Sequence, residues 1–521
     1  MYKSVRFTNR HLSRAHWRRL QRKTATLLLI AATAIFSIVA EYTAIHAAEP
    51  RAPNVVILLA DDMGYGDLAV QNPASKIPTP NLDRLAGEGL RFTDAHSSSG
   101  ICTPSRYALL TGRYHWRKFH GIVNSFDPPV FDDGELTLAE MLRRKGYRTA
   151  CVGKWHLGWN WNAIKRDGAK SDGKLGYAAD AFDWTQRVSG GPLDHGFEYY
   201  FGDDVPNFPP YAWIENDHVI TAPTERLTVS PAPAEGNAEC RPGPMAADWR
   251  LDAVMPKLTE KAVAWIGQQK GRESPFFLYF PFTSPHAPIV PTKAFRDKSQ
   301  AGGYGDYVVQ TDDTVGQVLR ALKENGFGDN TIVLFTSDNG PEHYAYPRVK
   351  NFSHRSMGPL RGLKRDIWEG GHRVPFIVRW PGIVKAGGVS DALVGQIDIV
   401  ATLAAVTGFE IPHGAAQDSR NQLPLLRDEN AKSAREELVH NTYKDHYAMR
   451  QGHWLYIDAP SGEVTKSPAW FNEANGYTPN EHRTALFDLQ DDLGQRRNVV
   501  AENPQVVERL RERLQQIRAG Q

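Results

Sequence analysis

Cysteine is scarce in this chain, which has three in 521 residues: Cys102, Cys151 and Cys240. So few cysteines exclude a disulfide framework as the main source of stability. Cys151 lies in the apolar, strand-like run 147–152 and is expected to be a buried free thiol, although one bridge between Cys151 and Cys240 stays open.

Long apolar runs are also rare. Residues 25–40 form the only one, and the rest of the sequence has the composition of a globular protein. Eight Lys or Arg precede that run within the first 24 residues, and small residues follow it. A basic start, a short apolar stretch and small residues predict a secretory signal over residues 1–48, with an uncleaved membrane anchor as the alternative. We therefore expect an exported protein, periplasmic, secreted or anchored through this segment, with no stable membrane partner elsewhere.

The sequence also lacks a large excess of either charge, since it has 61 basic and 59 acidic residues. Removing residues 1–48 takes away eight Lys or Arg and one Glu, which leaves 53 basic and 58 acidic residues and a net charge of about −5. A mature chain with this balance gives no reason to expect nucleic-acid binding.

Buried strands alternate with helices along most of the sequence, and there are no internal repeats. Continuous apolar runs predict strands covered on both faces, and amphipathic helices separate them. The expected strands are 54–60, 148–152, 276–280, 331–336 and 374–380, and the expected helices are 136–145, 257–269 and 306–325. This order predicts an α/β fold with a large, mostly parallel sheet.

The pattern changes after about residue 425. Short polar strands at 447–450, 454–457 and 484–489 precede a charged helix at 504–518. We expect a smaller antiparallel α+β subdomain at 426–521, packed on a catalytic domain at 49–425. The Pro- and Ala-rich patch 230–243 reads as a surface loop.

The most specific local pattern is Cys-Thr-Pro-Ser-Arg at 102–106, followed by Tyr-Ala-Leu-Leu-Thr-Gly-Arg at 107–113. Pro104 suits the first turn of a helix, and Gly112 suits its end. Cys102 is therefore expected at a helix N-terminus, where free N–H groups and the helix dipole favour an anion.

Polar side chains directly follow four of the expected strands. In an open parallel sheet, ligands bind at the carboxyl ends of strands, so these side chains are expected to meet at one rim. The residues concerned are Asp61, Asp62, Lys154, His156, His286, Asp338 and Asn339.

Three of these residues are carboxylates and one offers an amide oxygen: Asp61, Asp62, Asp338 and Asn339. An all-oxygen set favours a hard cation, and calcium tolerates irregular geometry better than most. Zinc would prefer cysteine or several histidines.

Together these residues resemble the type I, formylglycine-dependent sulfatases of the alkaline phosphatase superfamily, over residues 53–500. In that family the signature cysteine is oxidised to formylglycine, so the resemblance implies that a maturation enzyme acts on Cys102. It also implies an arylsulfatase-like sulfuric ester hydrolase with one calcium ion per chain. The implied metal ligands are Asp61, Asp62, Cys102, Asp338 and Asn339.

The resemblance assigns the remaining catalytic positions to Arg106, Lys154, His156, His286 and Lys364. A hydrated aldehyde at residue 102 would attack sulfur and later expel sulfate. His156 would take the proton for that second step, and His286 would protonate or bind the leaving oxygen. Lys154 and Lys364 would hold sulfate oxygens, while Arg106 would position the hydrate.

The substrate is expected to be a sulfated small molecule or, more in keeping with export, a sulfated polysaccharide. The aromatic and acidic segment 198–217 suggests a sugar site, although a loop packed onto the domain is an equal alternative. Candidate substrate contacts are Asp203, Asp204, Trp213 and His446.

Two other functions compete with sulfate ester hydrolysis. A phosphomonoester or phosphonate hydrolase of the same superfamily could use a similar rim, but phosphatase members carry Ser or Thr and two zinc sites. A non-catalytic carbohydrate-binding relative would be expected to have lost Cys102, a lysine or a metal carboxylate, and all of these are present.

Overall fold

The computed structural model describes residues 51–171, 176–228 and 239–520, together with residue 4 and residues 17–19. The chain divides into two units, Met1–Arg51 and Ala52–Gln521. Most of the predicted leader 1–48 and residues 230–238 of the predicted surface loop lie outside the described residues. Among the residues that are described, no helix is long and apolar enough to cross a membrane.

The second unit is built on a ten-stranded sheet with the order β13-β2-β12-β11-β1-β10-β4-β5-β6-β7. Every residue of its three central strands is buried, as their apolar sequences predict, because helices cover both faces. The strands in chain order are β1 (Asn54–Ala60), β2 (Leu90–Phe92), β4 (Arg148–Val152), β5 (Tyr199–Gly202), β6 (Ile214–Glu215), β7 (His218–Val219), β10 (Phe276–Pro281), β11 (Thr331–Ser337), β12 (Phe376–Arg379) and β13 (Gly388–Ser390).

The middle of this sheet is parallel, and its edges are mixed. Strands β11, β1, β10, β4 and β5 run parallel, whereas β12 runs antiparallel to β11. After β11 the chain stays at the carboxyl rim, through α7 (Ala345–Phe352) and α8 (Glu369–His372), and enters β12 from that rim. This excursion holds several of the predicted site residues beside the strand ends.

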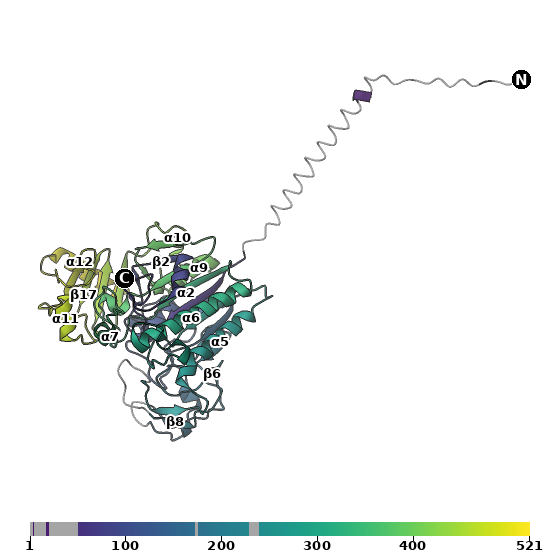
Figure 1. The fold of residues 1–521 in the computed structure, drawn as a ribbon, viewed down its shortest axis with the longest axis horizontal. Helices are drawn as coiled ribbons and strands as arrows, with labels where there is room; N and C mark the ends of the chain where they lie inside the picture. Colours follow the sequence, from purple (N-terminus) through teal and green to yellow (C-terminus); the bar gives the residue numbers. More distant parts are fainter. Residues whose placement is uncertain (1–3, 5–16, 20–50, 172–175, 229–238, 521) are drawn as a thin grey trace. The chain divides into compact units, whose positions relative to one another are not determined.

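Helices cover both faces of the sheet in two layers, and α5 and α6 of one layer lie side by side in Figure 1. Helix α2 packs on α6 in this layer. The other contains α3, α4 and α9. Their bounds are α2 (Pro80–Gly87), α3 (Cys102–Thr111), α4 (Leu138–Arg144), α5 (Val254–Gly267), α6 (Gly302–Glu324) and α9 (Ile399–Thr407).

A separate four-stranded antiparallel sheet, in the order β15-β16-β17-β18, forms the C-terminal part of the unit. Helix α12 (Pro504–Arg518) packs on β16 and β17. The other elements here are α10 (Leu423–Arg427), β15 (Glu437–Asn441), β16 (Tyr447–Gln451), β17 (Trp454–Asp458), α11 (Ala469–Asn475) and β18 (Ala485–Asp488). The predicted fold class, a large mostly parallel sheet with a smaller antiparallel α+β part, is confirmed.

Two small ladders complete the unit, β3 (Ala95–His96) with β14 (Val394–Gly395) and β8 (Glu225–Leu227) with β9 (Gly243–Met245). Cys102, Cys151 and Cys240 are all free and buried. The bridge that the sequence left open between Cys151 and Cys240 is therefore absent from the structure.

Candidate active site

The polar residues predicted at the carboxyl rim do meet there. Asp61 and Asp62 follow β1, and Asp338 and Asn339 follow β11, the strand paired with it. The Asp62 N–H donates to Asp338 Oδ1 at 3.2 Å, and Asn339 Nδ2 donates to Asp62 Oδ1 at 2.6 Å. The two strand ends are thus joined by their own acidic and amide side chains.

Cys102 is the first residue of α3, which ends at Gly112 in the left-handed conformation that the sequence predicted (φ 67°). The Cys102 thiol is fully buried and lies 3.8 Å from Asp61 Oδ1. Burial raises the pKa of this unmodified thiol to about 12. No side chain caps the start of α3, so its first N–H groups and its dipole favour an anion beside residue 102.

Arg106, one helical turn after Cys102, is buried among acceptors. Its guanidinium donates to Asp338 Oδ2 at 2.8 and 2.9 Å and to the Lys154 carbonyl at 3.1 Å, and it lies 3.4 Å from Asp61 Oδ2. Burial alone lowers its pKa, but Asp338 and Asp61 more than offset this effect. Arg106 therefore braces both strand ends against the start of α3.

Two buried lysines reach the same carboxylates. Lys154 Nζ lies 2.6 Å from Asp61 Oδ2, and Lys364 Nζ lies 2.7 Å from Asp62 Oδ1. Although burial alone raises the pKa of Asp61, Lys154, His286 and Arg106 together hold it below its ordinary value. Asp61 is thus kept anionic, and the two lysines bring positive charge to the surroundings of Cys102.

The donor set fits a hard cation. Ligand atoms of Asp61, Asp62, Cys102 and His286 lie within 4.8 Å of one another. Asn339 Oδ1, another predicted ligand, is buried and has no hydrogen-bond partner. A buried amide oxygen without a donor, beside two carboxylates, is an arrangement that a bound cation satisfies.

Each of the two site histidines has one ring nitrogen fixed by a backbone carbonyl. His156 Nε2 donates to the Val123 carbonyl at 3.0 Å, so Nδ1 carries the lone pair, and Nδ1 has no partner. Burial lowers the pKa of His156 well below its ordinary value. His286 Nδ1 donates to the Ala287 carbonyl at 2.5 Å, which leaves Nε2, 3.7 Å from Asp62 Oδ2, for other chemistry.

A cleft of about 230 Å³ opens onto this group, and Asp62, His156, His286 and Lys364 line its inner end. Its outer wall includes residues that sequence reasoning did not select. They are Ile122, Asn124, Asn207, Phe208, Glu239, Arg241, Glu342, Arg365 and Tyr443.

The outer wall of the cleft contains both charged and aromatic side chains. The Arg241 guanidinium lies 3.5 Å from the centre of the Phe208 ring, and Asn207 Oδ1 and Glu239 Oε2 are buried without partners. Arg365 pairs with Glu342 at 2.5 and 2.7 Å. Unpaired polar atoms beside an aromatic face are suited to the hydroxyl groups and apolar face of a sugar ring.

The predicted substrate contacts lie elsewhere. Trp213 is in the core, stacked on Phe201 at 5.1 Å and in contact with Trp249 at 4.7 Å. Asp203 and Asp204 are buried, and burial raises the pKa of each to about 7. His446 sits in the turn between β15 and β16, and none of the four lines the cleft.

The segment 198–217 nevertheless contributes to the cleft, through Val205, Asn207 and Phe208. Its most conspicuous aromatic and acidic residues are buried because the strands β5 and β6 at its two ends carry them into the core. Glu239 and Arg241 belong to the patch that the sequence predicted as a surface loop. The usable sequence signals for the outer wall were the closeness of Glu342 to Asn339 and of Arg365 to Lys364 along the chain.

Comparisons with known proteins agree with this geometry. The chain matches the sulfatase family over residues 53–409 and the family "N-sulphoglucosamine sulphohydrolase, C-terminal" over residues 363–520. N-acetylgalactosamine-6-O-sulfatase of Bacteroides thetaiotaomicron is 34% identical over 507 residues, covering 89% of this chain and 93% of that protein. Arylsulfatase A of Bos taurus is 33% identical over 473 residues, with 86% and 83% covered.

A solved structure from work on glycosaminoglycan metabolism by Bacteroides thetaiotaomicron superposes with a TM-score of 0.75 at 32% identity. The match covers 90% of this chain and all of that one. The similarity therefore includes both the large sheet and the C-terminal sheet.

Proposed function

Because the chain belongs to the sulfatase family, we propose that it hydrolyses sulfate monoesters on carbohydrate, using a formylglycine made from Cys102 and one calcium ion. The observation that carries the proposal is the meeting of Cys102, two lysines and the carboxylates of two strand ends at one helix N-terminus. Maturation requires a formylglycine-generating enzyme in the host.

The calcium ion would be held by Asp61, Asp62, Asp338, Asn339 and residue 102. Calcium would supply positive charge beside the reacting oxygens, and the formylglycine hydrate would supply the nucleophile and later release sulfate. The unpartnered Asn339 Oδ1 and the close carboxylates of Asp61 and Asp62 support this assignment.

Lys154 and Lys364 hold the sulfate group in this proposal. Each Nζ has three N–H donors. Lys154 contacts Asp61, and Lys364 contacts both oxygens of Asp62 with Glu342 more distant at 3.8 Å, so each has a donor left for a sulfate oxygen. Both lysines are buried, where charge stabilisation of a transition state is stronger than in water.

His156 accepts a proton at Nδ1 from the group at residue 102, because its Nε2–H is committed to the Val123 carbonyl. His286 exchanges a proton with the leaving oxygen through Nε2, because its Nδ1–H is committed to the Ala287 carbonyl. Both rings lie at the inner end of the cleft, where sulfate would bind.

The proposed substrate is a sulfated polysaccharide or one of its sugars. Relatives named N-acetylgalactosamine-6-O-sulfatase and the aromatic and charged wall formed by Phe208, Arg241 and Tyr443 support this choice. N-acetylgalactosamine 6-sulfate is therefore the first sugar to test. We also propose export to the periplasm or the medium, on the strength of the basic and apolar segment before residue 48.

The test compares kcat/KM for a small aryl sulfate and for N-acetylgalactosamine 6-sulfate. Lys364→Ala should lower both values by about a hundredfold or more, since each substrate presents the same sulfate oxygens. Arg241→Ala should lower the sugar value by about tenfold or more and leave the aryl sulfate value nearly unchanged, because only remote binding is lost.

Arg250→Ala, a change at an exposed arginine with 73% of its side chain accessible, is the matched control and should alter neither value. Faster turnover of an aryl phosphate or phosphonate than of the aryl sulfate by the unmutated protein would contradict the proposed function. Equal losses on both substrates for Arg241→Ala would contradict the sugar-binding role of the outer wall.

A further inference from the structure

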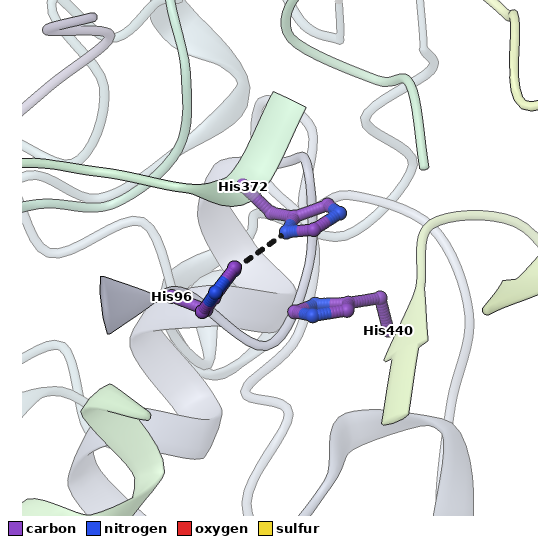
Figure 2. A group of neighbouring side chains, drawn as sticks. All are labelled: His96, His372 and His440. Atoms are coloured by element: carbon purple, nitrogen blue, oxygen red, sulfur yellow. Dashed lines mark hydrogen bonds between the residues drawn. The ribbon is translucent and has the colours of Figure 1, made fainter. Parts of the chain in front are cut away.

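A second buried cluster of metal-binding side chains lies outside the candidate active site. His96 ends β3, His372 ends α8 and His440 is in β15, and all three are fully buried (Figure 2). One ring nitrogen from each lies within 4.8 Å of the others. These elements are far apart in sequence, and no step of the proposed reaction uses the three histidines.

Hydrogen bonds outside the cluster determine which nitrogen faces inward on two of the rings. His372 Nε2 lies 3.2 Å from the Ile367 carbonyl, which can only accept, so Nε2 carries the proton. His96 Nε2 lies 2.7 Å from Asp94 Oδ1, a carboxylate that Arg373 and Arg450 also contact, at 3.2 and 3.0 Å. His96 therefore also donates through Nε2.

This pattern leaves two lone pairs facing each other. The remaining nitrogens, His96 Nδ1 and His372 Nδ1, are 3.1 Å apart, as the dashed line in Figure 2 shows. Two unprotonated nitrogens at this distance repel each other, so a cation must lie between them, either an added proton or a metal ion. A histidine that donates one N–H to a carboxylate or carbonyl and turns the other nitrogen inward has the usual arrangement of a metal ligand.

The third histidine distinguishes these two possibilities. Neither ring nitrogen of His440 has a hydrogen-bond partner of normal geometry, although the Ser97 backbone lies near the ring. A proton shared by His96 and His372 would leave His440 without a role, whereas a metal ion would use one of its nitrogens.

Three buried imidazoles from separate elements form a donor set that suits zinc and its neighbours in the first transition row. Glu369, a buried carboxylate with Oε1 unpartnered and Oε2 held by Arg373 at 3.1 Å, belongs to a separate group with Asp94 and His96.

The spacing is close to that of a tetrahedral site. Zinc–nitrogen bonds of about 2.0–2.1 Å place two ligand nitrogens about 3.3 Å apart, and the observed separation of 3.1 Å needs little adjustment. The His372 and His440 rings are stacked, with centroids 3.5 Å apart. The His440 ring must therefore turn out of this stack to bring a nitrogen to the ion.

We propose that His96, His372 and His440 form a second metal site that binds one zinc-like transition-metal ion. The ion would link the main sheet to the C-terminal sheet, because His440 belongs to β15 and the other ligands belong to the main body. Its role would be structural, since all of its protein ligands are buried.

The test uses the full chain, stripped of metal with a chelator and titrated with Zn²⁺ or Co²⁺ in the presence of excess Ca²⁺. Bound metal is counted by elemental analysis after gel filtration, and Co²⁺ geometry is followed by its visible absorption. The unmutated chain should retain one transition-metal ion with a tetrahedral Co²⁺ spectrum, and its Tm should rise on binding.

Variants separate this site from the calcium site. His440→Ala should lose the transition-metal ion and keep calcium, whereas Asp338→Asn should lose calcium and keep the transition-metal ion. His413→Ala, at an exposed histidine, is the control for loss of an imidazole and should keep both.

Failure of the unmutated chain to bind stoichiometric Zn²⁺ or Co²⁺ at micromolar concentration would overturn the proposal. The histidine cluster would then hold only a shared proton. If His440→Ala does not fold, anomalous scattering from zinc-soaked crystals of the unmutated chain replaces the variants. A peak between the three rings supports the site, and a peak only at Asp61 and Asp338 overturns it.

Discussion

The acidic residues of the candidate site each contact more than one partner, and these contacts fix the positions of the side chains. Asp338 accepts two hydrogen bonds from Arg106 through Oδ2 and one from the Asp62 N–H through Oδ1. Asp61 is contacted by Lys154 and Arg106. The proposed ligand oxygens and the lysines proposed to bind sulfate are thus held in fixed relation before a substrate enters, which would reduce reorganisation during the reaction.

Asp203, a buried acid near the candidate site, is expected to lower the stability of the fold at neutral pH. Burial raises its pKa to about 7 from an ordinary value of 3.8, and neither of its oxygens has a hydrogen-bond partner. Between these pH values the folded chain keeps a proton that the unfolded chain releases. Stability should therefore fall as pH rises from about 4 to 7 and stay low above that.

Asp203→Asn should remove much of this slope. We expect the variant to be more stable than the unmutated chain at pH 8, by at most about 4 kcal/mol, because each pKa unit corresponds to about 1.4 kcal/mol. At pH 4 the two should be nearly equal. Urea unfolding at both pH values measures the difference, and an equal difference at pH 4 and pH 8 would show that Asp203 is not the titrating group.

At the scale of elements, helix α2 depends on a cap supplied by another helix. The side chain of Thr79, its N-cap residue, does not cap it. Asp312 of α6 instead accepts from the N–H groups of Asn81 and Leu82 at 3.1 and 2.8 Å. A long-range cap of this kind fixes the angle between two helices as well as ending one of them.

Asp312→Ala should leave these first-turn N–H groups without an acceptor in the protein interior. We expect a loss of about 1–3 kcal/mol in the free energy of unfolding, as for other buried donors left unpaired. Asp313→Ala, on the same helix but only partly buried, is the control and should cost less than about 0.5 kcal/mol. Equal losses for the two variants would contradict the capping role.

The elements that the sequence predicted best are those with a strong local pattern. Strand 54–60 and helix 504–518 match the structure at both ends, because a continuous apolar run and a charged amphipathic stretch that starts at a proline are local signals. The short strands β2, β6, β7 and β13 at and beside the two edges of the sheet were missed, since each has only two or three residues and depends on its neighbours for pairing.

The same contrast applies to the site. Asp61, Asp338 and Lys154 could be found because each follows a buried strand, and Cys102 because it opens a distinctive motif. Arg241 and Tyr443 come from irregular segments without periodicity, and tertiary packing alone brings them to the cleft. Trp213 was chosen for its chemistry, but its ring packs in the core between Phe201 and Trp249.

Over the whole molecule, a buried ion pair ties the C-terminal sheet to the large one. Arg435, just before β15, donates to both carboxylate oxygens of Asp398, at 2.8 and 2.5 Å, and to the Asp418 carbonyl at 2.7 Å. Asp398 stands immediately before α9 of the main body. The two sheets are therefore held together by a bidentate contact as well as by apolar packing.

Arg435→Ala should leave Asp398 as a buried charge without its main partner. We expect a loss of about 3–5 kcal/mol in the free energy of unfolding, with Arg435→Lys losing less because it keeps the charge. Lys432→Ala, at a side chain that is 80% accessible, is the control and should change stability little. Losses below about 1 kcal/mol for Arg435→Ala would mean that apolar packing alone joins the two sheets.

The central claim, that this sulfatase works through a modified Cys102, is tested most directly by the mass of the peptide carrying residue 102. The protein must come from a host that makes formylglycine and must be active on an aryl sulfate. Conversion of the thiol to the aldehyde should lower the peptide mass by roughly 18 mass units, and Cys102→Ala should show neither the shift nor activity. Full activity in a preparation whose peptide carries only unmodified cysteine would contradict the account.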